Sequence, residues 1–379
     1  MTRLPSACFT KFTSINELYA NNTGIELIED DDFQNVRYLQ ILNLSGNKID
    51  KFKNLSFLYL GSLREIDFSH NQIEDLDLNI SNVSVWNNLM KIDFSYNKIK
   101  KFNEQILQKY FKTTQYSNRK VSILLNNNQI EKFISTMRNC EILYDQQSTL
   151  ELNLTYNSLK SIESKCDITV LDISNNQLED VKANATEVIA DNNKIKTMNF
   201  FTDPNIVSLK NNDLKSLDYV NFLSTFKNVQ ELDISNNSFG TLKKETFADM
   251  RNLKKLSLRG IGLTRTLFGL FGHLRKLEYL DLSYNDLSTF DHRHFLALDN
   301  LKILELSGNK LRGDDMFYIN FRNVLPNLQF IALEGNELWC DHLSKIKKNL
   351  NAQQIELIEA KYPVKYESNI YGIQCFYDG

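Results

Sequence analysis

Residues Leu280-Asp281-Leu282-Ser283-Tyr284-Asn285-Asp286-Leu287 carry the pattern that decides the fold. The template is L-x-L-x-x-N-x-L. One residue separates the first two leucines, so both side chains leave the same face of a short strand. The asparagine then lies at a turn, where its amide can bond backbone groups that the turn leaves unpaired. One such unit cannot bury its apolar face alone, whereas a stack of units can.

The pattern recurs along the whole chain. The fourteen units have their turn positions at Thr23, Asn47, Asn71, Asn97, Asn128, Asn157, Asn176, Asn193, Asn212, Asn237, Ile261, Asn285, Asn309 and Asn336. This register predicts an α/β solenoid, a leucine-rich repeat horseshoe with parallel strands on its concave face. Ile261 lacks a side-chain amide, so we expect a looser turn there.

Repeat length divides the chain into regular and short units. Many units span 24 residues, but the intervals from Asn157 to Asn212 are only 19, 17 and 19. Seventeen residues cannot hold a strand, a turn and a helix, so the return leg should be nearly extended and the middle of the stack flatter. In the 24-residue units a spine of phenylalanines is expected at Phe33, Phe57, Phe247, Phe271 and Phe295, with Phe9 in the same phase.

Two longer intervals and the two ends depart from the regular unit. Residues 103–111 have helical spacing, and 141–149 more weakly so. We expect the solenoid to span 1–338 and a capping region to span 339–379, with a helix over Leu343–Ala360 tied by a Cys340–Cys375 bridge. The chain begins inside a repeat, so an N-terminal cap and a signal peptide are expected to precede it; capping by residues 1–13 is the alternative.

The cysteines bear on the compartment. Cys140 and Cys166 occupy similar phases of neighbouring units, so stacking should bring them together as a second bridge. Two bridges favour an oxidising compartment; the alternative is reduced thiols in a cytosolic protein. Cys8 is left over, for a missing cap or a partner chain.

N-x-S/T sequons agree with secretion, although an asparagine-rich repeat creates some by accident. Outside the expected strands, the favoured glycosylation sites are Asn54, Asn79, Asn82 and Asn184. The remaining sequons are Asn21, Asn43, Asn153 and Asn236. Glycans at Asn43 or Asn153 would stand on the concave face.

The residue between the paired apolar positions should face the concave surface. Down the stack it is Tyr19, Asn43, Asp67, Asp93, Leu124, Asn153, Asp172, Ile189, Ser208, Asp233, Ser257, Asp281, Glu305 and Ala332. The acidic members could form a ladder for a basic partner, or could simply be the commonest solvated form of this repeat. Aromatic side chains dominate binding hot spots. The predicted protein-binding residues are therefore Asp67, Asp93, Tyr96, Tyr156, Asp172, Asp233, Asp281 and Tyr284.

Nothing in the sequence indicates catalysis. Nucleophile-elbow, phosphate-loop, H-E-x-x-H and dinucleotide motifs are absent, and His292 with His294 is a poor metal pair. We therefore predict no enzyme activity, no catalytic residues, no metal and no cofactor. A net charge of −3 with pI near 6.0 argues against nucleic-acid binding. The chain has no run of eighteen apolar residues that could span a membrane.

Five stretches resemble a known family. They are R-L-P-S-A-C-F-T-K-F at 3–12, L-D-I-S-N-N-Q-L at 171–178, V-I-A-D-N-N-K-I at 188–195, V-S-L-K-N-N-D-L at 207–214 and N-E-L-W-C-D-H-L-S-K-I at 336–346. They are similar to the insect leucine-rich repeat immune proteins of mosquito haemolymph. The resemblance implies extracellular protein binding in innate defence, with a complement-like thioester protein or another leucine-rich repeat chain as partner.

Two other functions fit the same sequence. One is the ectodomain of a Toll-like or adhesion receptor, which a membrane span in the full transcript would favour. The other is an intracellular leucine-rich repeat scaffold, which free thiols and unmodified sequons would favour.

Overall fold

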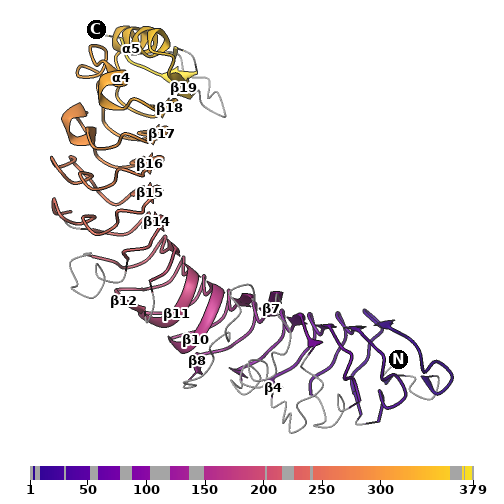
Figure 1. Cartoon of the computed structure of the whole chain (residues 1–379). Coiled ribbons are helices and arrows are strands. Elements are labelled where there is room, and N and C mark those ends of the chain that lie inside the picture. Colours follow the sequence, from indigo (N-terminus) through magenta and orange to yellow (C-terminus); the bar gives the residue numbers. More distant parts are fainter. Residues whose placement is uncertain are drawn as a thin grey trace. The chain divides into compact units, whose positions relative to one another are not determined.

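The computed structural model describes residues 3–4, 9–29, 31–51, 59–76, 88–102, 120–135, 149–200, 203–215, 226–239, 242–358, 369–370 and 372–377. The chain divides into two compact units. Unit 1 comprises Met1–Lys194 with Met198–Thr202, and unit 2 comprises Ile195–Thr197 with Asp203–Gly379 (Figure 1). The predicted helix at 103–111 and nearly all of 141–149 lie outside the described residues.

In unit 1 the strands of successive repeats pair in parallel, each with the next. They are β1 (Glu17–Tyr19), β2 (Ile41–Asn43), β3 (Glu65–Asp67), β5 (Lys91–Asp93), β7 (Lys120–Leu124), β9 (Thr149–Asn153), β10 (Ser161–Asp172) and β11 (Asp180–Ile189). On the return legs β4 (Asp75–Leu76) pairs with β6 (Lys101–Phe102), and β8 (Lys132–Ser135) with β10. β12 (Thr197–Phe200) crosses the division between the units.

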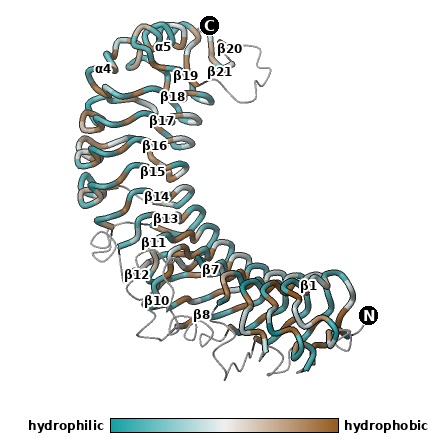
Figure 2. Tube along the Cα trace, turned by 45° about the vertical axis from the view of Figure 1, so that its right-hand side comes forward, coloured by the Kyte–Doolittle hydropathy of each residue, from teal (hydrophilic) through white to brown (hydrophobic). Residues whose placement is uncertain are grey.

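Unit 2 continues the same construction. Its parallel strands are β13 (Ile206–Ser208), β14 (Glu231–Asp233), β15 (Lys255–Ser257), β16 (Tyr279–Asp281), β17 (Ile303–Glu305), β18 (Phe330–Ala332) and β19 (Glu356–Ile358). The helices among its described residues are η2 (His292–Phe295), α4 (Phe321–Val324) and α5 (Cys340–Ala352), and β20 (Asn369–Ile370) pairs antiparallel with β21 (Ile373–Gln374). Hydrophobic and hydrophilic stretches alternate along each coil (Figure 2).

The turn asparagines hold successive coils together, as Asn71 illustrates. Its side-chain oxygen accepts from the backbone N–H of Ile49 in the preceding repeat at 3.0 Å. Its side-chain nitrogen donates to the carbonyls of Leu44 and Phe68, at 2.9 and 3.1 Å. Because a buried polar group without a partner costs about 1–3 kcal/mol, an asparagine that bonds both coils fixes the stacking register.

At Ile261 the turn position has no side-chain amide. The backbone N–H groups of Ile261 and Leu263 both donate to the side-chain oxygen of Asn285, each at 3.0 Å. Gly260 and Gly262, which flank Ile261, have φ angles of +63° and +82°, a region that glycine adopts without strain. The following asparagine therefore supports this turn, while the predicted looseness stays a prediction.

The phenylalanine spine is confirmed where the structure describes it. Phe33, Phe247 and Phe271 are fully buried, and the rings of Phe271 and Phe295 are 5.6 Å apart. Phe9 is also buried, whereas Phe57 lies outside the described residues.

The extended return leg of the short repeats is confirmed. β10 has 12 residues and β11 has 10, and they pair through most of their length. One prediction fails as a result: Asn184 does not lie outside the strands but within β11, half-buried, with its side-chain amide donating to Asp167. The flatter middle of the stack stays a prediction.

The C-terminal region differs from prediction in its second part. The helix ends at Ala352 instead of Ala360, and β19 then joins the parallel sheet beside β18. Ile355 and Leu357, both buried, alternate at the period of a strand. The structure contains a disulfide between Cys340 and Cys375, with Cα atoms 4.9 Å apart.

The remaining predicted modifications fall largely outside the described residues. Cys166 is disulfide-bonded and fully buried, whereas Cys140 lies outside them. Asn54, Asn79 and Asn82 also lie outside. In the part of the chain that the structure describes, no helix is long and apolar enough to cross a membrane.

Candidate protein-binding surface

The outer face of the sheet is formed by the first and third residues of each three-residue strand. In β16, Leu280 is fully buried, Tyr279 is half-buried and Asp281 is buried at 8% exposure. The predicted ladder positions occupy the third place, and the parallel register aligns them, as for Asp233, Ser257 and Asp281. Sequence spacing therefore predicted the register of this row correctly, whereas Asp93 and Asp281 in the row are buried and not exposed.

The aspartates of that row are tied to their own turns. In each case one carboxylate oxygen accepts from the backbone N–H two residues later. The pairs are Asp67 with Ser69 at 2.9 Å, Asp93 with Ser95 at 3.0 Å, Asp172 with Ser174 at 3.1 Å, Asp233 with Ser235 at 3.0 Å and Asp281 with Ser283 at 2.8 Å. This hydrogen bond gives a structural reason for the recurring aspartate and serine of the L-D-L-S pattern.

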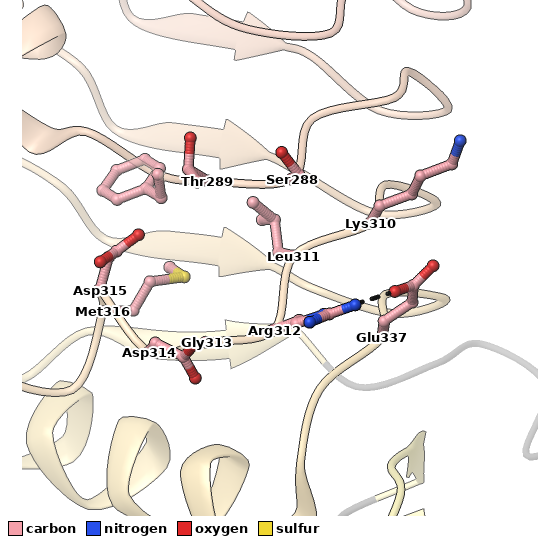
Figure 3. Close-up of a pocket in the computed structure, with 11 residues that line it drawn as sticks. Ser288, Thr289, Lys310, Leu311, Arg312, Gly313, Asp314, Asp315, Met316 and Glu337 are labelled. Atoms are coloured by element: carbon pink, nitrogen blue, oxygen red, sulfur yellow. Dashed lines mark ion pairs between the residues drawn. The ribbon is translucent and has the colours of Figure 1, made fainter.

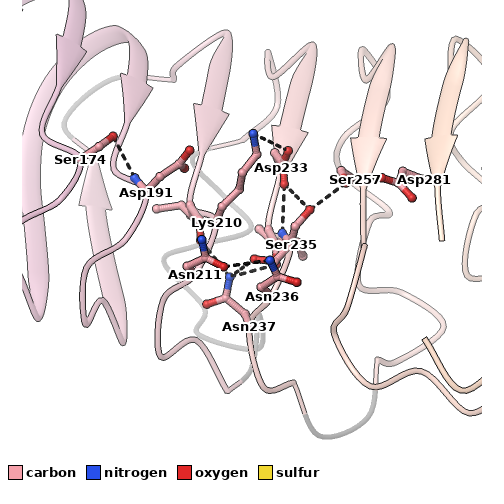
Figure 4. Close-up of polar contacts among 12 residues, drawn as sticks. Ser174, Asp191, Lys210, Asn211, Asp233, Ser235, Asn236, Asn237, Ser257 and Asp281 are labelled. Carbon is pink, nitrogen blue, oxygen red and sulfur yellow. Dashed lines mark hydrogen bonds and ion pairs between the residues drawn. The ribbon is translucent and has the colours of Figure 1, made fainter. Parts of the chain in front are cut away.

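In unit 2 the same row forms a chain of polar contacts (Figure 4). The Lys210 ammonium lies 3.3 Å from a carboxylate oxygen of Asp233. The hydroxyls of Ser235 and Ser257 are 2.8 Å apart, and that of Ser257 donates to Asp281 at 3.2 Å. These contacts restrict the side chains of the row, and restricted side chains lose less entropy when a surface binds.

The three predicted tyrosines are exposed and lie at turns of unusual conformation. Tyr96, Tyr156 and Tyr284 are 48%, 58% and 58% exposed, with φ angles of 56°, 53° and 54°. Asparagine or glycine occupies this position in most other repeats, as at Asn127 and Gly308. A bulky residue in this left-handed region costs on the order of 1 kcal/mol, and such strain concentrates at functional sites.

Neighbouring side chains hold two of these rings. The His70 and Tyr96 rings stack in unit 1, with centroids 4.2 Å apart and planes at 9°. In unit 2 the Arg259 guanidinium lies 3.7 Å from the centre of the Tyr284 ring and donates to the Ser283 hydroxyl at 3.0 Å. Aromatic groups fixed in this way are suited to act as anchors.

The sequence reading missed the row formed by the first residue of each strand. Tyr279, Ile303 and Phe330 are in register on β16, β17 and β18, and each is half-buried. Burial raises the pKa of the Tyr279 hydroxyl, and the charges of Asp281 and Glu305 raise it further. The signal was present, since side chains two apart on a strand share a face.

A hollow lies on the loops beside the C-terminal region (Figure 3). Four of its charged groups are paired: Lys310 with Asp286 at 2.6 Å, Arg312 with Glu337 at 3.8 Å and Asp314 with His342 at 2.9 Å. None of the predicted binding residues lines it.

His294 is engaged within the protein. Its Nδ1 lies 2.8 Å from the hydroxyl of Thr266, and its Nε2 lies 3.5 Å from a carboxylate oxygen of Asp291. Among the residues that the structure describes, no three His, Cys, Asp or Glu side chains are grouped so that they could hold a metal ion.

Comparison with known proteins agrees with this architecture. The leucine-rich repeat family model matches residues 2–73, 205–263 and 265–311, and no curated protein sequence matches the chain. With the strands and asparagine turns described above, the chain has the fold of a leucine-rich repeat solenoid.

Three solved structures are similar to the chain. The mosquito LRIM1/APL1C complex aligns with a TM-score of 0.63 at 19% identity, over 100% of this chain and 62% of that one. The APL1 leucine-rich repeat domain aligns at 0.62 and 20%, over 100% and 88%. The Toll–Spatzle complex of Drosophila aligns at 0.62 and 17%, over 93% and 45%. At these identities the likeness shows the fold.

Proposed function

We propose that this is an extracellular leucine-rich repeat protein that binds other proteins in innate immune recognition, as a receptor or scaffold for complement-like factors. The observation that carries protein binding is the set of exposed tyrosines at left-handed turns beside an ordered polar sheet face. The fold favours binding over catalysis, because its strand array is a broad platform and not an enclosed cleft.

Two observations support the immune and extracellular parts of the proposal. Mosquito leucine-rich repeat proteins are among the structural neighbours. Cys340 and Cys375 form a disulfide, and Cys166 is also disulfide-bonded, as oxidising compartments favour. The partner would be a complement-like thioester protein or a second leucine-rich repeat chain.

One alternative is also supported by a specific observation. The fold resembles that of the Toll–Spatzle complex, so a receptor ectodomain that binds a protein ligand through the same face is the second candidate. Both candidates require the tyrosines to contact a protein, so one experiment tests what they share.

Replacing Tyr96, Tyr156 and Tyr284 by glycine gives the sharpest test. Gly46 and Gly308 already hold this position, each with a φ angle of 66°, so the change removes the rings without straining the turns. Immobilised wild type and triple variant are exposed to the animal's own body fluid, and bound proteins are identified by mass spectrometry.

We expect the triple variant to lose at least about tenfold of its captured partner, because hot-spot aromatics contribute about 2 kcal/mol or more each. Tyr318→Ser is the matched control, since Tyr318 is 87% exposed but lies on a loop away from the strands. Equal capture by wild type and triple variant would refute binding through these tyrosines.

A further inference from the structure

Glu305 differs from every aspartate in the row it belongs to. Its side chain is one methylene longer, and no hydrogen bond contributes to its pKa, in contrast to the aspartate–serine turns of the other repeats. Within the described part of the chain its carboxylate has no ion-pair partner. Burial, and after it the charge of Asp281, raises the pKa of Glu305. A half-buried carboxylate without a bonding partner is a costly feature for stability alone.

This carboxylate lies in a hollow of about 390 Å³ on the sheet face. We call the face around it the β16–β18 face, defined by Tyr279, Asp281, Ile303, Glu305 and Phe330. Tyr279 lines the hollow with Glu305. Tyr279 is in register with Ile303 and Phe330 on the next two strands, and all three side chains offer half-buried apolar surface.

The charges around the hollow do not balance. Asp281, Glu305 and Glu334 contribute three carboxylates, and Arg259 contributes one cation. The Arg259 guanidinium is stacked on Tyr284 and bonded to Ser283, and it only partly offsets the other causes that raise the pKa of Glu305. The hollow is therefore complementary to a positive group and repels a negative one.

We propose that the β16–β18 face binds a basic segment of the protein partner, with the cation of a lysine or arginine side chain against Glu305 and its aliphatic stem against Tyr279. Arginine and lysine place apolar stems on such surfaces while their charge meets a carboxylate. This inference rests on the proposed protein-binding function and names the chemistry of the partner.

Two synthetic peptides of equal length serve as probes. One alternates arginine with leucine, the other alternates glutamate with leucine, and both carry a fluorophore for anisotropy titration against the full chain. We expect the arginine peptide to bind, more weakly at high salt, and the glutamate peptide not to bind.

Glu305→Gln removes the charge at nearly constant shape, and we expect it to weaken binding of the arginine peptide at least about fivefold. Glu245→Gln is the matched control, because Glu245 is an exposed glutamate outside the strands; binding should remain unchanged. Glu305→Asp keeps the charge but shortens the side chain, so the carboxylate should bond its own turn and binding should fall by an intermediate factor. Equal binding by wild type and Glu305→Gln would overturn the proposal.

The partner captured from body fluid separates the two proposals. If the triple tyrosine variant loses the partner and Glu305→Gln retains it fully, protein binding stands and the basic segment is refuted. If both variants retain the partner, the tyrosine surface is refuted as well. Melting curves of each variant establish that the chain is folded.

Discussion

The regular repeats of unit 2 and the short repeats of unit 1 have the same strand and turn, but they differ in the return leg behind the strand. Both use a strand followed by an asparagine that bonds two coils, as at Asn285 and Asn176. Behind the strands, unit 2 buries whole phenylalanine rings, whereas β11 buries Ala183 and Ala185. The strand and turn are thus the constant part of the fold, and the length of the return leg sets the volume of the core behind it.

The largest expected effect comes from emptying the bulky core. Phe271→Ala removes a fully buried ring that packs 5.6 Å from Phe295. The loss of burial and the residual cavity should lower the free energy of unfolding by about 3–5 kcal/mol. Denaturant unfolding, with hydrogen exchange to locate the loss in unit 2, measures this. Phe271→Leu removes fewer buried atoms and should lower the free energy of unfolding less than Phe271→Ala does. A loss below about 1 kcal/mol for Phe271→Ala would contradict the spine's role.

Replacing the turn asparagines that both kinds of repeat share should lower the free energy of unfolding by a smaller amount, which depends on the number of hydrogen bonds lost. Asn285 accepts from two backbone N–H groups, whereas Asn176 accepts from one, that of Leu159. Each buried polar group left without a partner costs about 1–3 kcal/mol. We therefore expect Asn285→Ala to lower the free energy of unfolding by about 3 kcal/mol and Asn176→Ala to lower it by about 2 kcal/mol. Equilibrium unfolding of the two variants compares them directly, and the reverse order would show that the extra bond at Ile261 contributes little.

Enlarging the small core tests the comparison from the other side. Ala185 is 2% exposed between paired strands, so Ala185→Leu should cost about 1–3 kcal/mol through overpacking. Leu256→Met, a volume-conserving change in the regular core, should cost less than about 1.5 kcal/mol. Thermal melts of both variants are sufficient, and a stable Ala185→Leu variant would mean that the short repeats contain unfilled space.

Sequence periodicity predicted the strands and turns well, because the residues that form them recur at fixed positions in the repeat pattern. Turn asparagines, strand positions and the phenylalanine spine all follow from spacing. β19 was missed because Leu350, Ile355 and Ile358 also fit a helical stripe, and only the open edge of β18 resolves the ambiguity. Asn184 was misplaced because a continuous strand through the return leg leaves no loop for it.

The binding surface was harder to predict for a different reason. The exposure of Tyr96, Tyr156 and Tyr284 follows from their place after the strand, but the ties of the aspartates depend on side-chain length and turn geometry. The setting of Glu305 depends on Asp281 and Glu334, which come from the preceding and following repeats. Stacking creates this site, and no single repeat contains it.

The smallest expected effect is on the pH dependence of stability, to which two glutamates of unit 2 contribute with opposite sign. The pKa of Glu305 is raised by burial, whereas the pKa of Glu278 is lowered by its hydrogen bond with Lys302. A raised folded-state pKa means that the contribution of Glu305 is fully present below its unfolded pKa and is lost as pH rises through the folded pKa. The contribution of Glu278 has the opposite sign: it is present at neutral pH and is lost as pH falls through its lowered folded pKa.

Glu305→Gln should therefore leave the melting temperature unchanged or raise it by about 1–2 °C at pH 7, and the gain should disappear near about pH 4, where the wild-type carboxyl is protonated. Glu278→Gln should not raise it at pH 7. Melting curves from pH 4 to pH 8 give the sign of the change in melting temperature for both variants. A fall in melting temperature for Glu305→Gln at pH 7 would mean that the carboxylate stabilises the fold, so its lack of a bonding partner would no longer argue for a role in binding.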